Sequence, residues 1–240
     1  MLIKTRGIVF RTVKYGETSV IADIFTEEKG LCSFIGGGVR TAKARMPFNL
    51  FQPMTAVDLV AYHREGAGAN RLKELRAAEI WTATPFDIRR GAVALFMAEI
   101  CRNSIQEEEE NGELFDFLLG HLRWLDATPY PIANLHLHFL LGLTEFLGFQ
   151  PQDPEKDGEQ FFDLSDGSFS SIPPPHALLL EPEQTSQMLG ILASPLESVH
   201  EIQLTRPQRK ALLGKLLQFY QLHLSNFKAV HTPEILEMVM

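Results

Sequence analysis

The stretch Leu31-Cys32-Ser33-Phe34-Ile35-Gly36-Gly37-Gly38-Val39-Arg40-Thr41-Ala42-Lys43-Ala44-Arg45 changes from an alternating apolar run to three glycines and then to three cations. The alternation predicts a β-strand, and glycine permits backbone conformations closed to other residues, so a turn or mobile loop is expected next. Arg40, Lys43 and Arg45 would project from that loop, where a polyanion such as a nucleic-acid backbone is a natural partner. An ordinary solvated surface loop is the alternative.

Four further segments before residue 81 have the composition of β-strands, and each connection between consecutive strands contains glycine. With 31–35 as the third in chain order, the expected strands cover residues 7–15, 19–26, 54–62 and 72–78. Five short antiparallel strands joined in this way favour a small barrel, and the oligonucleotide-binding (OB) barrel is the commonest five-stranded version.

From residue 81 onward the apolar residues recur with a helical period. Asp87 is a candidate N-cap of a helix reaching Ile105, and Thr205 is a candidate N-cap of a final helix reaching Asn226. Three more helices are expected at residues 114–125, 132–147 and 181–192. The segment 132–147 is apolar nearly all round, which predicts a central position in a helical domain.

The helical pattern is interrupted at about residues 150–175, where Asp-Pro, Asp-Gly and three consecutive prolines occur. A small hairpin around residues 161–163 and 167–169 is expected inside this insertion. The predicted fold is therefore an α+β multidomain protein. It has a five-stranded OB-type β-barrel that binds nucleic acid over residues 1–80, and an all-α helical domain over residues 81–240 that carries the small irregular insertion.

The charge is divided unequally along the 240 residues. The net charge is −8, but residues 1–80 carry 12 Lys and Arg against 8 Asp and Glu, whereas residues 81–240 carry 10 against 22. This asymmetry favours an anionic polymer as the partner of the N-terminal part. Only two cysteines occur, Cys32 and Cys101, and no signal peptide or membrane-spanning run is expected, so a cytoplasmic protein is predicted.

No catalytic motif is found. His136 and His138 are two residues apart on an expected helix and would point in nearly opposite directions, so they could not share a metal ion. The three glycines lack the Gly-Lys-Ser/Thr continuation of a phosphate-binding loop, and no nucleophile elbow, His-Glu-x-x-His pair or cysteine cluster occurs. No enzyme activity is predicted; a nuclease that uses carboxylates and magnesium is the alternative.

Binding chemistry remains. A small barrel holds single-stranded nucleic acid by stacking bases on exposed aromatic rings while cations follow the phosphates. The available aromatic residues are Phe10, Tyr15, Phe34 and Tyr62, most of which are expected in the core. The candidate DNA-binding residues are Lys14, Arg40, Lys43, Arg45, Arg71 and Lys73.

Several segments, taken in order, resemble the RecO family of bacterial DNA repair proteins. They are Thr5-Arg6-Gly7-Ile8-Val9, Tyr15-Gly16-Glu17-Thr18-Ser19, Phe25-Thr26-Glu27-Glu28-Lys29-Gly30, Gly38-Val39-Arg40 and Leu50-Phe51-Gln52-Pro53. The segment from Phe139-Leu140-Leu141 through Phe146-Leu147-Gly148-Phe149 and the final helix with Phe227-Lys228 are also similar, so the resemblance covers nearly the whole chain.

The resemblance implies a recombination mediator with an N-terminal OB barrel and a helical domain. Such proteins bind single- and double-stranded DNA, anneal complementary strands, and bind the acidic C-terminal tail of single-stranded DNA-binding protein. With RecR they help to load RecA onto DNA covered by that protein. The loop that carries Arg40, Lys43 and Arg45 matches the basic loop of the family.

Two departures from the family pattern stand out. The four zinc-site cysteines that many members carry in the insertion are absent, so no zinc or other cofactor is expected. His136 and His138 lie where the family often has arginines that receive the acidic tail, and Arg102 and Arg123 are candidate substitutes. A protein-interaction adaptor in a repair complex, with little intrinsic DNA binding, is the alternative function.

Overall fold

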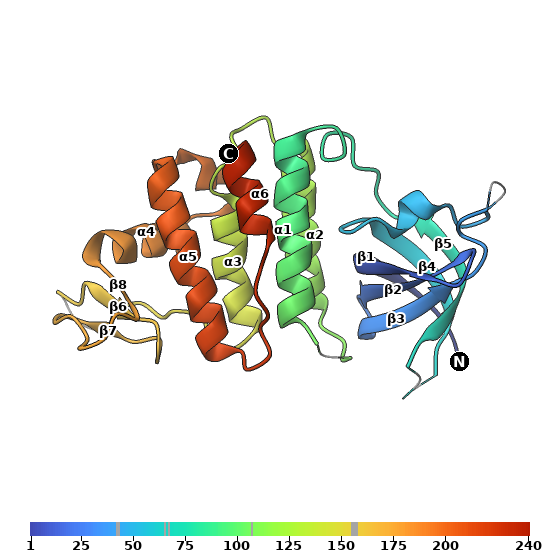
Figure 1. Ribbon diagram of the computed structural model, residues 1–240, viewed down its shortest axis with the longest axis horizontal. Helices are drawn as coiled ribbons and strands as arrows, with labels where there is room; N and C mark the ends of the chain where they lie inside the picture. The colour runs from blue at the N-terminus through green and yellow to red at the C-terminus, as the bar shows by residue number, and fades with distance from the viewer. Residues whose placement is uncertain (42–43, 65, 67, 107, 155–157) are drawn as a thin grey trace. The chain divides into compact units, whose positions relative to one another are not determined.

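The computed structural model of the chain describes residues 1–41, 44–64, 66, 68–106, 108–154 and 158–240. These residues form two compact units, Met1–Ala127 and Thr128–Met240 (Figure 1). The elements of the first unit are β1 (Leu2–Tyr15), β2 (Ser19–Thr26), β3 (Gly30–Gly36), η1 (Phe48–Phe51), β4 (Ala56–Tyr62), β5 (Asn70–Ala77), α1 (Ile88–Ser104) and α2 (Gly112–Ala127).

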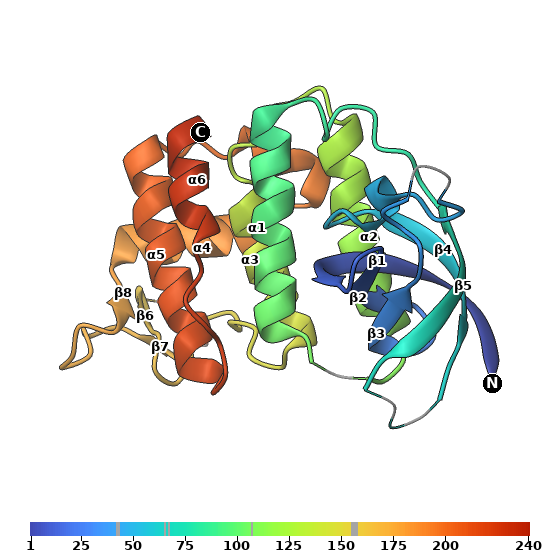
Figure 2. The ribbon, with the colours of Figure 1, turned by 45° about the vertical axis from the view of Figure 1, so that its right-hand side comes forward.

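The strands of the first unit form a closed barrel in the order β1-β2-β3-β5-β4, with β4 pairing back onto β1 (Figure 2). Every pairing is antiparallel except that of β3 with β5. The predicted five-stranded OB-type barrel is therefore confirmed. Buried residues alternate with more exposed ones along β2 and β3, and this alternation places one face of each strand in the barrel core.

Strand β1 is long enough to pair with both of its neighbours. Residues 2–8 pair with β4 and residues 7–15 pair with β2. The register shifts between Val9 and Arg11, which leaves Phe10 as the extra residue of a β-bulge. Val9 lies in the barrel core, whereas the ring of Phe10 stacks on that of Phe25 with their centroids 5.7 Å apart.

Two glycines lie where a side chain would not fit. A Cβ atom on Gly36 would lie 2.8 Å from the ring of Phe51, and one on Gly7 would lie 2.5 Å from Cγ2 of Ile24. Phe51 is fully buried and belongs to the barrel core. Gly36 therefore allows η1 to pack into the core beside the end of β3.

Helices α1 and α2 belong to the same compact unit as the barrel. The Phe25 ring lies between those of Phe10 and Phe115, and the Phe25 and Phe115 centroids are 6.4 Å apart. Arg6 lies over the Phe115 ring, 5.1 Å from its centroid, and donates hydrogen bonds of 2.8 and 2.6 Å to the Glu27 carboxylate. The last strand of the barrel, β5, ends at Ala77, within the predicted span of residues 1–80. The first compact unit is longer than the barrel, because it also includes α1 and α2 and ends at Ala127.

The connector between the barrel and α1 is fastened by a carboxylate at the end of α2. Asp126 accepts hydrogen bonds from the three backbone N–H groups of residues 82–84 at 2.7 to 2.9 Å and from the Thr82 hydroxyl at 3.1 Å. Burial acts to raise the pKa of Asp126, but these hydrogen bonds outweigh it and hold the pKa well below its ordinary value of 3.8. Trp81 also donates its indole N–H to the Met54 carbonyl at 2.9 Å.

The second unit consists of helices around a central helix, with a small sheet. Its elements are α3 (Leu135–Phe146), β6 (Phe161–Asp163), β7 (Phe169–Ser170), β8 (Leu179–Leu180), α4 (Pro182–Leu192), η2 (Leu196–Glu201), α5 (Arg206–His223) and α6 (Thr232–Val239).

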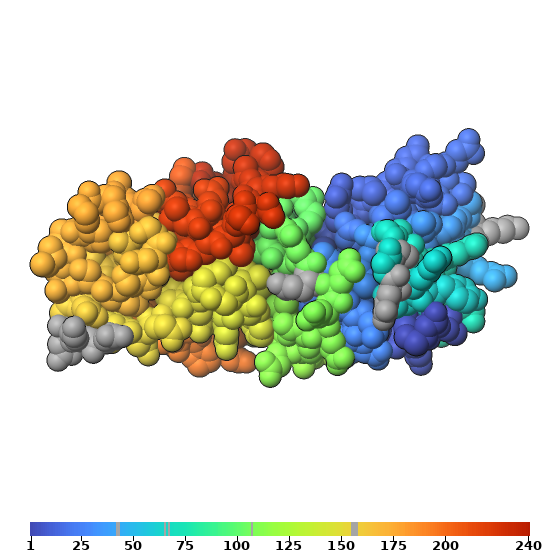
Figure 3. All heavy atoms as spheres, turned by 90° about the horizontal axis from the view of Figure 1, so that it is seen from below, coloured from blue at the N-terminus to red at the C-terminus, as the bar shows by residue number. Residues whose placement is uncertain are grey.

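Helix α3 lies at the core of the second unit, as predicted. Its Leu and Phe residues from Leu135 to Leu143 are at most 1 % exposed. The Tyr220 hydroxyl of α5 donates a 2.6 Å hydrogen bond to the Leu140 carbonyl. Figure 3 shows yellow atoms of the middle of the chain beside the red C-terminal segment. The Phe149 ring, which follows α3, packs edge-on against Tyr220 of α5 with centroids 5.1 Å apart.

The insertion holds the predicted hairpin, formed by β6 and β7, and a third strand, β8, that the sequence analysis missed. The Phe162 ring lies 4.9 Å from that of Phe169 and 5.4 Å from that of Phe219, measured between centroids. Within the described residues, no group of three or more His, Cys, Asp or Glu side chains could hold a metal ion. The absence of a cofactor stays a prediction.

Both predicted N-caps are confirmed. The Asp87 side chain accepts from the backbone N–H groups of Arg89 and Arg90, and Thr205 forms a capping box with Gln208. The final helix was predicted to reach Asn226, but α5 ends at His223. Its C-cap residue is extended, and the short helix α6, absent from the prediction, follows.

None of the helices in the described part of the chain combines the length and apolar character needed to cross a membrane.

We expect Gly36→Ala to lower the free energy of unfolding of the first unit by about 2 kcal/mol, because η1 must shift to accommodate the new methyl group. Both tryptophans, Trp81 and Trp124, lie in this unit, so their fluorescence during urea unfolding follows it. Gly37→Ala is the control, because a Cβ atom there meets nothing within 4 Å. Equal unfolding midpoints for the two variants would contradict the proposed close approach.

We expect Asp126→Ala to destabilise the first unit by about 2 kcal/mol at pH 7, because three backbone N–H groups lose a charged acceptor. A lowered pKa in the folded state means that this stabilisation is complete above pH 3.8 and is lost as the pH falls further. The deficit of the variant relative to wild type should therefore shrink in urea titrations at acid pH. Asp116→Ala, which removes an exposed carboxylate from the same helix, should shift the midpoint little.

Candidate nucleic-acid interface

The loop that follows β3 is anchored to the barrel by Val39 and by the backbone of its first cation, Arg40. Gly38 has a positive φ of 68°, which favours glycine, and Val39 turns inward to 2 % exposure. The backbone N–H of Arg40 donates a 3.1 Å hydrogen bond to the Thr18 carbonyl in the β1–β2 turn. The Arg40 side chain is exposed, as is that of Arg45. Lys43 lies outside the described residues.

Strand register brings three of the predicted cations to one end of the barrel. Lys14 of β1 pairs with Val20 of β2, which in turn pairs with Gly36 of β3. Arg71 of β5 pairs with Ile35, the residue before Gly36. Lys14 and Arg71 therefore flank the start of the loop that carries Arg40, and all three side chains are exposed.

Lys73, the remaining predicted cation, is the extra residue of a second β-bulge. Ala61 of β4 pairs with Leu72, and Val60 pairs with Glu74, so Lys73 has no partner on β4. Its side chain is exposed. A bulge at this point increases the local twist of β5 and turns Lys73 relative to Arg71.

One row of residues on the outer side of the barrel crosses all five strands. Successive pairings join Val13, Ile21, Ile35, Arg71, Tyr62 and Leu2. We call this row the outer belt. Residues that pair across strands share a face of the sheet, and successive residues along a strand point to opposite faces. On every strand, a residue next to the row in sequence is buried in the barrel core. The outer belt therefore faces solvent. The sequence alone does not reveal this row, because the register between strands cannot be read from one strand at a time.

The structure separates the four candidate aromatic residues into two pairs. Tyr15 and Tyr62 are 52 % and 55 % exposed, whereas Phe10 and Phe34 are 3 % and 0 % exposed. Phe34 points into the barrel core and Phe10 packs among the rings that face α2. Only the two tyrosines among these four are accessible to a ligand.

The four predicted partner-binding residues fall in both compact units. Arg102 is exposed in the last turn of α1, and Arg123 of α2 donates a 2.7 Å hydrogen bond from Nε to Glu79, which raises the pKa of Arg123. His136 is buried on α3, where burial and the charge of Arg209 lower its pKa to about 3.

His138 is half-buried on another face of α3. Its ring N–H donates a 3.1 Å hydrogen bond to the Ser194 carbonyl, and burial lowers its pKa. Both histidines are therefore neutral at physiological pH and supply no charge for an acidic partner.

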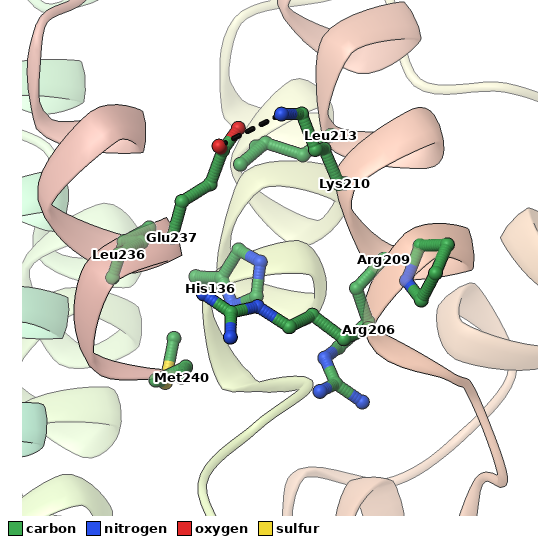
Figure 4. Close-up of a pocket in the computed structure, with 9 residues that line it drawn as sticks. His136, Arg206, Arg209, Lys210, Leu213, Leu236, Glu237 and Met240 are labelled. Atoms are coloured by element: carbon green, nitrogen blue, oxygen red, sulfur yellow. Dashed lines mark hydrogen bonds and ion pairs between the residues drawn. The ribbon is translucent and has the colours of Figure 1, made fainter.

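Helices α3, α5 and α6 enclose a pocket of about 360 Å³ in the second unit (Figure 4). The lining residues are His136, Arg206, Pro207, Arg209, Lys210, Leu213, Leu236, Glu237 and Met240. The basic residues of α5 come from Arg206-Pro207-Gln208-Arg209-Lys210, a run of cations in the acidic part of the chain that would have indicated this site from sequence.

The pocket holds more positive charge than its carboxylate neutralises. Lys210 donates a 2.8 Å hydrogen bond to Glu237, which joins α5 to α6. Arg209 donates to the Leu204 carbonyl at 2.6 Å, and burial and the nearby charge of Arg206 lower its pKa. In the part of the chain that the structure describes, no ion pair links Arg206 or Arg209 to a carboxylate.

Comparison with known proteins agrees with this architecture. The family model "Recombination protein O N terminal" matches residues 1–81, and "Recombination protein O C terminal" matches residues 85–231. The chain is 33 % identical over 238 residues to DNA repair protein RecO of Bacteroides fragilis, covering 99 % of this chain and 98 % of the relative. It is 34 % identical over 241 residues to DNA repair protein RecO of Flavobacterium psychrophilum, covering 100 % and 99 %. The chain therefore belongs to the RecO family of DNA repair proteins.

Proposed function

We propose that this protein is a recombination mediator whose barrel holds DNA by its phosphate backbone, without sequence preference. The observation that carries the proposal is the gathering of Lys14, Arg40 and Arg71 around one end of the barrel. Exposed cations on three different elements of a closed barrel present a surface that a flexible polyanion can follow. Residues 1–80 carry a net charge of +4 in a chain of net charge −8, which supports placing this contact on the barrel.

The finer roles follow from membership of the family. We propose that the chain binds single- and double-stranded DNA, promotes annealing, and acts with RecR to load RecA onto DNA covered by single-stranded DNA-binding protein. Holding strands by their backbones leaves base edges free to pair, which suits an annealing role. The proposed role requires no covalent chemistry, so we assign no catalytic residue. A site of action in the cytoplasm, at the nucleoid, is part of the same proposal.

We expect the triple variant Lys14→Ala, Arg40→Ala and Arg71→Ala to lose at least about tenfold in DNA affinity, because three phosphate contacts are removed. In fluorescence anisotropy with labelled oligonucleotides of two unrelated sequences, both affinities should fall together. The slope of log affinity against log salt should flatten by about 0.7 to 0.9 per lost contact.

Arg76→Ala is the matched control for that experiment. Arg76 is an exposed cation on the same strand as Arg71, lies opposite Asp58, and is 3.7 Å from the Glu74 carboxylate. It should leave affinity and salt slope unchanged. Unchanged affinity in the triple variant would remove these cations from the interface. Failure of wild type to bind any DNA would favour the adaptor function, and degradation of DNA on adding magnesium would favour a nuclease.

We further propose that the pocket of the second unit receives the acidic tail of single-stranded DNA-binding protein. Arg206 and Arg209 supply positive charge there, and neither forms an ion pair with a carboxylate among the described residues. Leu213, Leu236 and Met240 supply an apolar wall for a side chain next to the acidic group. The two histidines of α3 are neutral and supply no positive charge, so in this assignment the charge for the acidic tail comes from the two arginines.

We expect Arg206→Glu to weaken binding of a labelled Asp-Asp-Asp-Leu-Phe peptide at least about tenfold, which corresponds to about 1.4 kcal/mol. Arg206 is exposed, so the fold should tolerate the change. Lys215→Glu makes the same charge change further along α5, outside this pocket, and should have little effect. Equal loss in both variants would indicate a diffuse electrostatic effect, and no loss in either would exclude the pocket.

A further inference from the structure

The outer belt is an apolar surface that the first unit leaves uncovered. Tyr62 and Leu2 are 55 % and 52 % exposed, Val13 is 37 % exposed, and Ile21 and Ile35 are half-buried. The barrel has another apolar outer surface, with Phe10 and Phe25, but there the ring of Phe115 packs over it. Along the described residues of the belt, no aromatic stacking from either helix is found.

On β1, β2 and β3 a polar row adjoins the apolar one. Two residues further along these three strands, the same face carries Arg11, Asp23 and Ser33, which pair with one another. Ser33 donates a 2.6 Å hydrogen bond to the Asp23 carboxylate, as expected for a solvated sheet surface. A contiguous row of exposed apolar residues on a solvated sheet is typical of an interaction surface.

The belt combines its apolar residues with an aromatic ring and a cation placed directly opposite one another. Tyr62 pairs with Arg71, so their side chains leave the sheet side by side. At the other end of the row, Tyr15 lies two residues beyond Val13 on the same face of β1. Neighbouring strands are about 4.8 Å apart, so the four steps from Val13 to Tyr62 span roughly 19 Å along the curved sheet. That length suits about four nucleotides, the lower end of the range for OB barrels.

We propose that the outer belt stacks the unpaired bases of single-stranded DNA, with Tyr62 as the stacking platform and Arg71 on the adjoining phosphate. This inference rests on the proposed DNA binding by the barrel and assigns the strand form that the belt selects. A duplex buries its base faces against one another, so only a single strand presents them to an aromatic ring. A polyanion suits the belt because Arg71 lies within it and Lys14 and Arg40 lie at the same end of the barrel.

The test compares three labelled ligands of equal length by fluorescence anisotropy: an oligothymidine single strand, the same backbone with abasic sites, and a duplex. Wild type should bind the oligothymidine at least about fivefold more tightly than the abasic strand, because the two differ in bases and not in phosphates. Tyr62→Ala should lose that advantage while its affinities for the abasic strand and the duplex stay unchanged. Tyr62→Phe should restore it, and Arg71→Ala should weaken binding of all three ligands.

Phe86→Ala is the matched control, because Phe86 is an aromatic residue of the same unit, 86 % exposed and outside the barrel. It should leave all three affinities unchanged. Equal weakening of all three ligands by Tyr62→Ala, or no change in any, would overturn the stacking role while leaving DNA binding by the barrel intact. Absence of binding by wild type to every ligand would overturn the proposed DNA binding and the belt assignment together.

Discussion

Closure of the barrel depends on a short parallel contact, in which Phe34 pairs with Asn70 and Ile35 pairs with Arg71. A parallel pair cannot be joined by a tight turn, so the chain makes a long excursion between β3 and β5, and the loop, η1 and β4 occupy it. Because Ile35 directly precedes Gly36, the same contact brings Arg71 beside the glycine-rich loop. The grouping of cations is thus a result of barrel topology.

The barrel and the second unit differ in charge. Residues 1–80 carry an excess of cations, whereas the second unit is rich in carboxylates and gathers three of its few cations at one pocket. A charge distribution of this kind attracts a polyanion to the barrel and repels it from the second unit. Burial of the two α3 histidines keeps them neutral, so the charge of the pocket comes from arginine and lysine and does not vary across physiological pH.

Local signals in the sequence predicted the strands, the main helices and both N-caps, because alternation, helical period and capping residues act over a few positions. Features that depend on pairing between distant segments could not be predicted. Phe10 and Phe34 alike follow β-type patterns, yet one faces a helix and the other the core. Tyr62 and Arg71 become neighbours only through register. Helix α6 was missed because eight residues give a weak periodic signal and its position depends on packing by Leu236.

The bulge at Phe10 also determines which change of length β1 can accommodate. Val9 faces the barrel core, whereas Phe10 and Arg11 both lie on the outer side of the sheet, because the extra residue interrupts the alternation. Deleting Phe10 would close the bulge and leave Arg11 to Tyr15 in register with β2, with loss of the ring that stacks on Phe25. Deleting a residue after Arg11 would instead shift the remainder of β1 by one position and move Val13 to the interior. Changes of length accumulated over evolution should therefore fall in the turns or at this bulge.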